Sequence, residues 1–588
     1  MFKASHKSTW LIILASLIMF TLLFGSALFK SQTIDEGPHL SAGYSYLATG
    51  DWRINPEHPP LVKFLAGLFV LPLNPRLPLD NPAWQEYNQW EFGRAFLYDN
   101  TVPADSLLLA GRLPMILISL TLLWLVWYWT KNYFGKTTAA LVSLFIVFEP
   151  NIIAHGRLIT TDVPLTLTFF GSVITFYNYL LKPSTKRLVF AAFIFVLALL
   201  TKFSSIILIP TLLIIYLLYR WQINSSDLSI KKFSLFKIIF VYLGITILSI
   251  WGFYGFQVQV PNDDPRIASL YSELNEIVES DTVDEQLPFV KTTINIFDPN
   301  TNFGALTKNF LESVPIPAYS YWRGLTSVFS HNQTGHGAYL LGEQSQFGWW
   351  YYFPIAFLVK VPVSLLIFLI FSLIFIIKKL FSHKFTDFIN RCKTADSKWI
   401  IITVPPLIYF TFSMLSNINL GVRHILPVFP FVIIMAAWAT NKLIKSNIWM
   451  RYTAIILLLV YVVSSISIFP HYLTYFNEIV GGAKNGHQIL LDSNLDWGQD
   501  LKLLKKYIDK EYITDFHFAY FGSADPTYYI NNIQPVPNDD DISRHGLPNY
   551  FIAISAGVLY SEDLNFEWLR QREPDHIIGH TIYIYDLR

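Results

Sequence analysis

Cysteine is almost absent from this sequence, because Cys392 is the only one among 588 residues. A single thiol excludes an intramolecular disulfide framework and any zinc site built mainly from cysteines. The charges also nearly cancel, since 43 Lys and Arg against 42 Asp and Glu leave a net charge of +1. The chain lacks the basic excess that favours nucleic acid, so we expect no nucleic-acid partner. It also lacks a Gly-rich phosphate loop after any predicted strand, which argues against a nucleotide-linked substrate.

Long apolar segments dominate what is present. Hydrophobic residues make up 53% of the chain and charged residues only 14%, and the mean hydropathy is +0.38. Apolar runs of this kind predict a polytopic α-helical integral membrane protein with about eleven transmembrane helices of about 20 residues each. The predicted spans are residues 9–30, 107–130, 137–155, 163–181, 188–201, 203–220, 234–256, 353–378, 399–416, 425–444 and 452–469.

Connections rich in Lys and Arg all fall on one side of the predicted membrane. Because basic loops stay in the cytoplasm, we expect the N-terminus to be cytoplasmic and the plasma membrane to be the location. Three longer segments, 31–106, 257–352 and 470–588, are then external. The basic connections are the N-terminus and residues 131–136, 182–187, 229–233, 378–398 and 441–445.

Two domains are predicted from this topology. Residues 1–469 form the transmembrane domain with the external loops 31–106 and 257–352, and residues 470–588 form a small external C-terminal α/β domain. In the second domain, "FHFAYFG", "YFIAISAGVLY" and "TIYIYDL" have the composition of strands. "DWGQDLKLLKKYI" has the periodicity of a helix.

Polar residues gather at the outer ends of the predicted spans. Cations at this face run against the inward bias of Lys and Arg, so some structural or functional partner is expected to hold them there. Carboxylates and cations at one membrane face suit a site that handles an anionic lipid headgroup and a nucleophile. The residues are Asp35, Glu36, Glu57, His58, Arg112, His155, Arg157, Asp162, Lys202, Arg423 and His424.

Several of these residues also have a simpler structural interpretation. Lys202 can extend along the membrane to reach water. Arg112 can bond between helices, and His155 can be a polar residue of a helix interface. Asp35 can cap a helix formed by "GPHLSAGYSYLATG". Capping does not exclude a catalytic role for the same carboxylate.

Two stretches of the first external loop resemble a known family. "DEGPHLSAGYSYLATGDW" (35–52) and "HPPLVKFLAG" (58–67) resemble the first external loop of GT-C glycosyltransferases, in the group of protein O-mannosyltransferases and aminoarabinose transferases. "RLITTDVPL" (157–165) resembles their second acidic motif. The resemblance implies a GT-C fold and a polyprenyl-phosphate-linked sugar as donor. It implies that the sugar moves to a hydroxyl acceptor (a protein, a glycan or a lipid) at the outer membrane face.

The resemblance also suggests residue roles. Asp35 matches the catalytic Asp of the family, and Glu36 adjoins it as a second catalytic carboxylate. Glu57 and His58 match a Glu-Lys pair whose Lys binds the donor phosphate. Because His replaces that Lys, we expect His58, Arg112, Lys202 and Arg423 to share the phosphate. Glu57, Arg157, Asp162 and His424 are predicted to bind substrate.

The chemistry of these groups suggests one displacement step. A carboxylate within hydrogen-bond reach of the acceptor hydroxyl can take its proton, which makes Asp35 the predicted general base. The leaving lipid phosphate gains charge, which fixed cations stabilise. A single displacement with one base inverts the anomeric centre.

The sequence is also compatible with other functions. A transporter or flippase of lipid-linked sugars also places charges in a membrane, and a catalytically inactive GT-C scaffold protein would keep the same spans. A divalent metal on Glu57, His58 and His155, or calcium on Asp496 and Asp500, is possible, although no metal or other cofactor is assigned.

Overall fold

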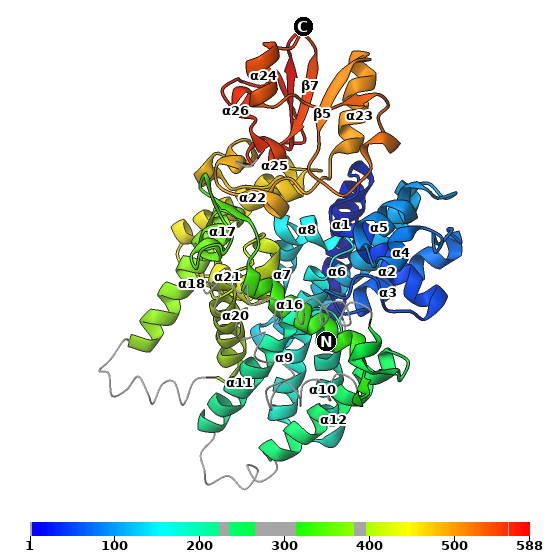
Figure 1. Ribbon diagram of the computed structural model, residues 1–588. Coiled ribbons are helices and arrows are strands. Elements are labelled where there is room, and N and C mark those ends of the chain that lie inside the picture. The colour runs from blue at the N-terminus through cyan, green and yellow to red at the C-terminus, as the bar shows by residue number, and fades with distance from the viewer. Residues whose placement is uncertain (1–2, 223–233, 265–312, 382–395, 562–563) are drawn as a thin grey trace, which may run out of the picture.

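The computed structural model describes residues 3–222, 234–264, 313–381, 396–561 and 564–588. A helical body makes up most of this part of the chain, and a module with a β-sheet lies at one end of it (Figure 1). The predicted basic connection 229–233, most of 378–398 and residues 265–312 of the predicted loop 257–352 lie outside the described residues.

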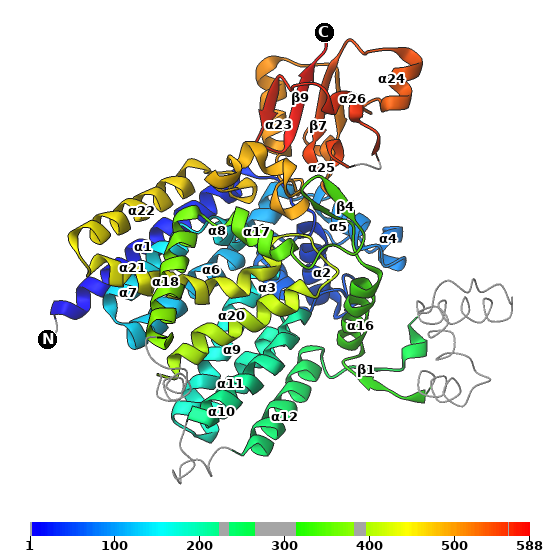
Figure 2. The ribbon, with the colours of Figure 1, turned by 90° about the vertical axis from the view of Figure 1, so that its left-hand side faces the viewer.

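Seven described helical segments are long and apolar enough to cross a membrane, or nine if each of two bent pairs is one span. Several of these long helices run side by side in Figure 2. The seven are Thr9–Phe29 of α1 (Lys3–Phe29), α6 (Ala104–Phe134), α9 (Asp162–Leu181), Phe203–Gln222 with α11 (Leu208–Gln222), α12 (Leu235–Phe253), Val422–Ile444 with α21 (Phe429–Ile444), and α22 (Ile448–Ser467).

The bent pairs interrupt two of the spans that the sequence predicts as continuous. Helices α7 (Lys136–Val147) and α8 (Pro150–Gly156) meet at 60°, and α17 (Tyr352–Lys360) and α18 (Val363–Phe381) meet at 114°. A proline follows each break, and proline cannot donate the next helical hydrogen bond. Two other predicted spans are helices too short for the test, α10 (Thr185–Leu199) and α20 (Lys398–Met414). Each of the eleven predicted spans therefore coincides with helical residues. By length and composition, however, only seven to nine of the described helical segments could cross a membrane.

The break between α17 and α18 leaves backbone carbonyls that need partners away from water. Asn151 Nδ2 donates to the Lys360 carbonyl at 2.8 Å, and Asn477 Nδ2 donates to the Val361 carbonyl at 2.8 Å. Lys360 itself is buried and donates through Nζ to the carbonyls of Leu473 and Asn494. Side chains from distant segments therefore satisfy this bend and fix the chain that follows α22 against it.

The first loop folds into short helices beside the membrane helices. Helix α2 (Glu36–Thr49) packs against α3 (Leu61–Val70) so closely that a Cβ on Gly43 would lie 1.8 Å from the Lys63 carbonyl. Only glycine permits this contact. The approach brings the loop with Glu57 and His58 back toward the start of α2, where Asp35 lies. The loop continues with α4 (Pro82–Gln85) and α5 (Gln89–Tyr98).

The described residues of the later loop include a helix and two short antiparallel strand pairs. Helix α16 (Tyr319–Thr334) contacts the first loop at Gly324, where a Cβ would lie 2.1 Å from the Pro56 carbonyl. Strand β1 (Val258–Gln259) pairs with β2 (Ile316–Pro317), and β3 (Ala338–Leu340) forms a hairpin with β4 (Glu343–Ser345).

The C-terminal module contains a five-stranded mixed sheet in the order β6-β5-β7-β9-β8. Strand β5 (Phe516–Ala519) runs parallel to β6 (Ile533–Gln534) and β7 (Phe551–Ser555), while β9 (Ile582–Asp586) runs antiparallel to β7 and β8 (His576–Ile578). The predicted α/β character is confirmed. Its helices are α23 (Leu501–Glu511), α24 (Asp539–His545), α25 (Ala556–Leu559) and α26 (Glu567–Arg570).

The segment that enters this module is joined to the first loop by backbone hydrogen bonds. The Ser31 amide donates to the Gln499 carbonyl at 3.0 Å, and the Ile34 amide donates to the Trp497 carbonyl at 3.2 Å. Lys30 Nζ adds an ion pair to Asp500 at 2.5 Å. The C-terminal module and the start of the first loop therefore lie on the same side of the helical body.

Candidate active site

Asp35 lies directly before α2, but its side chain makes no capping hydrogen bond. Instead, Arg423 Nη1 donates to Asp35 Oδ2 at 2.9 Å. Both side chains are largely buried, with 17% of Asp35 and 9% of Arg423 exposed. The capping role considered from the sequence is thus not the one that the carboxylate adopts. Asp35 faces a cation from a segment almost 400 residues away.

A second ion pair lies next to the first. Asp162, the first residue of α9, accepts a hydrogen bond from Lys202 Nζ at 2.6 Å. Its other oxygen lies 3.7 Å from Arg423 Nη1. Lys202 therefore turns inward to a buried acid instead of extending toward water. Arg423 links the two carboxylates, and four predicted residues form one cluster, the Asp35 cluster (Asp35, Asp162, Lys202 and Arg423).

Histidines surround this cluster. The rings of His39 and His58 lie edge to face at 5.2 Å. Burial lowers the pKa of His58 well below its ordinary value, and the charges of Lys202 and Lys63 lower it further. His58 is thus neutral near pH 7 and can offer a phosphate a hydrogen bond but no charge. His424 lies within electrostatic range of Lys202, Arg423 and Asp162.

The loop with Glu57 and His58 is held by Lys63, which the sequence analysis did not single out. Lys63 is 1% exposed, and its Nζ donates to the carbonyls of Asn55 and His58 at 2.5 and 2.7 Å. Glu57 accepts a hydrogen bond from Gln89 at 3.1 Å. A lysine inside "HPPLVKFLAG" is the signal that could have revealed this role.

Arg112 and Glu36 form a separate buried pair. The five N–H groups of Arg112 meet five acceptors: both oxygens of Glu36 at 2.8 and 2.6 Å, and the carbonyls of Ala27, Lys30 and Ser31. Guanidinium has five donors in total, so none is left for a phosphate. Burial acts to raise the pKa of Glu36, but the charge and hydrogen bonds of Arg112 bring it below its ordinary value. This pair ties the first loop to α6.

The segment from His155 to Asp162 carries buried polar atoms with no hydrogen-bond partner among the described residues. They are His155 Nδ1, Thr160 Oγ1, Asp162 Oδ2 and the three guanidinium nitrogens of Arg157. Buried atoms of this kind usually bind water or a ligand. Arg157 is fully buried, and burial together with the charge of Arg112 lowers its pKa to about 9. Arg157 thus lies toward the Arg112–Glu36 pair.

Residues from the segment that enters the C-terminal module complete the Asp35 cluster. Arg423 Nε donates to Ser493 Oγ at 3.1 Å, and its guanidinium carbon lies 4.3 Å from the centre of the Trp497 ring. Both residues belong to "LDSNLDWGQDL". The three Asp residues and the Trp in this stretch were the sequence signal that could have revealed them.

No three His, Cys, Asp or Glu side chains gather as a metal site within the described part of the chain. Asp500 pairs with Lys30, and Asp496 accepts hydrogen bonds from the amides of Gly498 and Gly557 at 3.2 and 3.1 Å. Burial raises the pKa of Asp496 to about 7. These two carboxylates therefore have protein partners in the structure.

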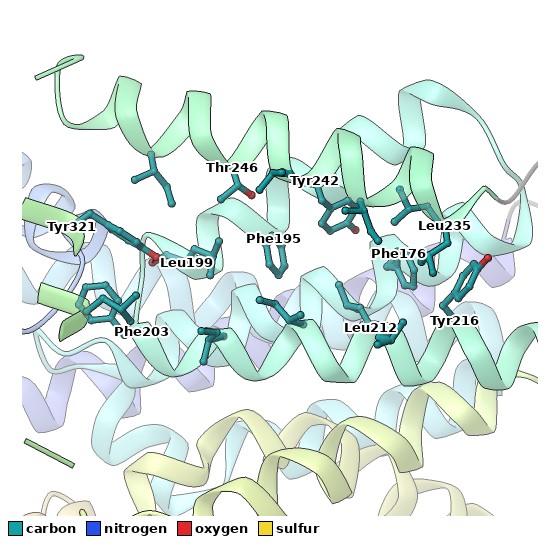
Figure 3. Close-up of a pocket in the computed structure, with 18 of the residues that line it drawn as sticks. Phe176, Phe195, Leu199, Phe203, Leu212, Tyr216, Leu235, Tyr242, Thr246 and Tyr321 are labelled. Atoms are coloured by element: carbon teal, nitrogen blue, oxygen red, sulfur yellow. The ribbon is translucent and has the colours of Figure 1, made fainter. Parts of the chain in front are cut away.

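An apolar cavity of about 400 Å³ lies along α11 and α12. Side chains of α11 and α12 face one another across it in Figure 3, among them Leu212 and Tyr242. Phe203, the residue after Lys202, lines one end together with Tyr321 of α16, and their rings lie 5.1 Å apart. The cavity thus runs along two membrane helices, and Phe203 at one end of it is the sequence neighbour of Lys202.

Residues 104–251 match the sequence profile of the family described as dolichyl-phosphate-mannose-protein mannosyltransferase. No curated protein matches the chain. Among solved structures, ArnT from Cupriavidus metallidurans bound to undecaprenyl phosphate is similar at 13% identity and a TM-score of 0.43, with 98% of each chain covered. Apo ArnT from the same organism is similar at 14% identity and a TM-score of 0.42, over 99% of this chain and 98% of ArnT.

The oligosaccharyltransferase of Archaeoglobus fulgidus in complex with Zn and sulfate is similar at 12% identity and a TM-score of 0.42, over 95% of this chain and 70% of that one. The family profile covers the segment that holds Arg112, Asp162 and Lys202. The resemblance predicted from the sequence is thereby confirmed: this chain resembles the membrane glycosyltransferases of the GT-C superfamily, in the group of the dolichyl-phosphate-mannose-protein mannosyltransferases.

Proposed function

We propose that this protein is a membrane glycosyltransferase that moves a sugar from a polyprenyl phosphate to a hydroxyl acceptor at the outer membrane face. The observation that carries the proposal is the Asp35 cluster, in which two carboxylates and two cations meet. The profile match over residues 104–251 supports the same reaction class.

Asp35 is the general base in this proposal. The acceptor oxygen attacks the anomeric carbon, the bond from that carbon to the phosphate oxygen breaks, and the acceptor proton passes to Asp35. One displacement of this kind inverts the anomeric centre. Before the donor binds, Arg423 neutralises Asp35. Arg423 bonds to one oxygen of Asp35, Oδ2, so the other carboxylate oxygen takes the acceptor proton while the guanidinium also binds the donor phosphate.

The phosphate is held by Arg423 and Lys202 with a hydrogen bond from neutral His58. These cations stabilise the charge that develops on the leaving phosphate. Asp162, Glu57 and His424 surround the same space and bind sugar or acceptor hydroxyls. Arg112 and Glu36 are left out of the substrate contacts, because the five N–H groups of Arg112 are used by Glu36 and three carbonyls. Arg157 stays a predicted substrate-binding residue, since its three guanidinium nitrogens have no partner among the described residues.

The apolar cavity receives the first isoprene units of the donor. Its lining on α12 extends from Leu235 to Ile250, and apolar surface of this length favours a linear hydrocarbon chain. Lys202 adjoins Phe203 at one end of the cavity, so a chain that lies there presents its phosphate to the cluster. In the proposed topology the N-terminus is cytoplasmic and residues 470–588 are external, with the domain boundary near residue 469.

The test is sugar transfer by the purified protein in liposomes that contain undecaprenyl or dolichyl phosphate sugars. Release of the polyprenyl phosphate is measured for the unmodified protein and for Asp35→Asn, which should lower kcat at least about 100-fold, the lower range for a general base. The control is Asp51→Asn, because Asp51 is a loop carboxylate paired with Arg53 outside the cluster. Near-normal turnover by Asp35→Asn would exclude Asp35 as the base. Translocation of intact donor without its cleavage would favour the transporter.

A further inference from the structure

The guanidinium of Arg423 is fixed on two of its three nitrogens. Nη1 donates to Asp35 and Nε donates to Ser493 Oγ at 3.1 Å. Ser493 in turn donates its own proton to the Leu420 carbonyl at 2.7 Å, so its oxygen is oriented to accept from Nε. Nη2 of Arg423 has no hydrogen-bond partner in the part of the chain that the structure describes, and it is not fully buried.

Trp497 fixes the plane of the same guanidinium. Its ring lies under Arg423, with 4.3 Å between the guanidinium carbon and the ring centre. Trp497 is 1% exposed, its amide donates to Gln499 Oε1 at 2.7 Å, and its carbonyl accepts from Ile34. The ring is therefore anchored to the residue that precedes Asp35, and a cation over a desolvated indole is stabilised by the ring electrons.

Close backbone approach supports this arrangement. A Cβ on Gly421 would lie 2.5 Å from Ser493 Oγ, so a glycine is needed for the hydroxyl to reach Arg423. Without Ser493 and Trp497, the guanidinium is free to rotate and to bind both oxygens of Asp35, because Arg–carboxylate pairs favour the two-bond geometry. That two-bond contact would use both oxygens of Asp35, and with them an N–H group of Arg423 that could otherwise bind the phosphate.

We propose that Ser493 and Trp497 are positioning residues that hold Arg423 in a one-bond contact with Asp35 and direct Nη2 toward the donor phosphate. This inference rests on the proposed function and adds to it that the segment entering the C-terminal module is part of the donor site. Neither residue touches the reacting atoms; both act through Arg423.

The experiment compares Ser493→Ala with Ser493→Thr, and Trp497→Leu with Trp497→Phe, in nanodiscs. We measure the donor KM and kcat across pH, and separately the affinity for undecaprenyl phosphate alone. Ser493→Ala and Trp497→Leu should raise the donor KM and weaken undecaprenyl phosphate binding about tenfold. Each change misdirects one charge-assisted hydrogen bond, the one from Arg423 Nη2 to the phosphate. The conservative variants, which keep the hydroxyl or the ring, should regain most of the affinity.

The control is Lys502→Ala, which removes a 3.0 Å ion pair between α23 and Asp105 but does not touch Arg423. It should leave KM and affinity unchanged. Unchanged binding in folded Ser493→Ala, or equal losses in Ser493→Ala, Ser493→Thr and Lys502→Ala, would overturn the positioning role. Absence of sugar transfer by the unmodified protein would overturn the proposed function instead, while the binding comparison still decides the role of Ser493 and Trp497.

Discussion

Two arginines that the sequence makes equivalent should respond to mutation in opposite ways. Arg112 and Arg423 are both predicted from the sequence to bind the donor phosphate. In the structure, the N–H groups of Arg112 are saturated by Glu36 and three carbonyls, and only 2% of the residue is exposed. We therefore expect Arg112→Met to lose stability while the surviving folded protein keeps its donor KM.

The magnitude follows from the burial of the pair. Removing one partner of a buried ion pair costs about 3–5 kcal/mol, because the other charge is left without compensation. Glu36 then takes up a proton, since burial raises the pKa of an unpaired carboxyl. A group whose pKa is raised in the folded state destabilises the protein as pH rises. The loss in Arg112→Met should therefore be larger at pH 8 than at pH 5.

A double-mutant cycle separates the pair from its surroundings. Glu36→Gln with Arg112→Met should be less destabilised than Arg112→Met alone, because no buried charge remains. Thermal unfolding of the purified protein and the donor KM are measured for each variant, with Arg423→Met as the comparison. Arg423→Met should lose transfer with a smaller loss of stability. The reasoning fails if Arg112→Met unfolds at the normal temperature and raises the donor KM.

Three further predictions concern the cavity, the topology and pH. Leu243→Trp, which fills the cavity, should raise the KM of a long-chain donor at least about tenfold, because burial of two methylenes of the donor is lost at about 0.8 kcal/mol each. Leu248 is on the same helix but does not line the cavity, so Leu248→Trp should have no such effect. In a protein without its native cysteine, Lys510→Cys should react with an impermeant thiol reagent outside intact cells and Ser446→Cys should not; the reverse pattern would refute the proposed topology. Because the pKa of Asp496 is raised to about 7, stability should fall as pH rises from about 4 to 7, and Asp496→Asn should flatten this slope in melting curves at pH 5 and 8.

Helices and the larger strands could be predicted from the sequence because their signals are local. Long apolar runs mark α6, α9, α12 and α22, and aromatic or β-branched residues mark β5, β7 and β9. The bends after α7 and α17 could not be predicted as angles, because proline breaks a hydrogen bond but packing sets the direction. Strands β6 and β8 have only two and three residues, too few for a periodic signal.

Some residues of the candidate site could be predicted from the sequence, and others could not. Asp35, Asp162, Lys202 and Arg423 were expected at one membrane face, and they lie in one cluster. Asp35 and Glu36 are adjacent in the sequence but serve different pairs, since neighbouring residues at a helix start point about 100° apart. Ser493 and Trp497 lie at least 70 residues from Arg423 in the sequence, so only the folded chain reveals the contact.

The backbone hydrogen bonds between residues 31–34 and 497–499 set an order of events during synthesis. Trp497 leaves the ribosome 462 residues after Asp35, which takes roughly 20–90 s at about 5–20 residues per second. Throughout that interval the membrane helices are already being inserted, while Ser31 and Ile34 lack their partners and Arg423 lacks its indole. A nascent chain therefore sits in the bilayer before the proposed donor site is complete. Completion of residues 493–499 supplies those partners, so a chain that ends before them lacks the contacts that hold Arg423.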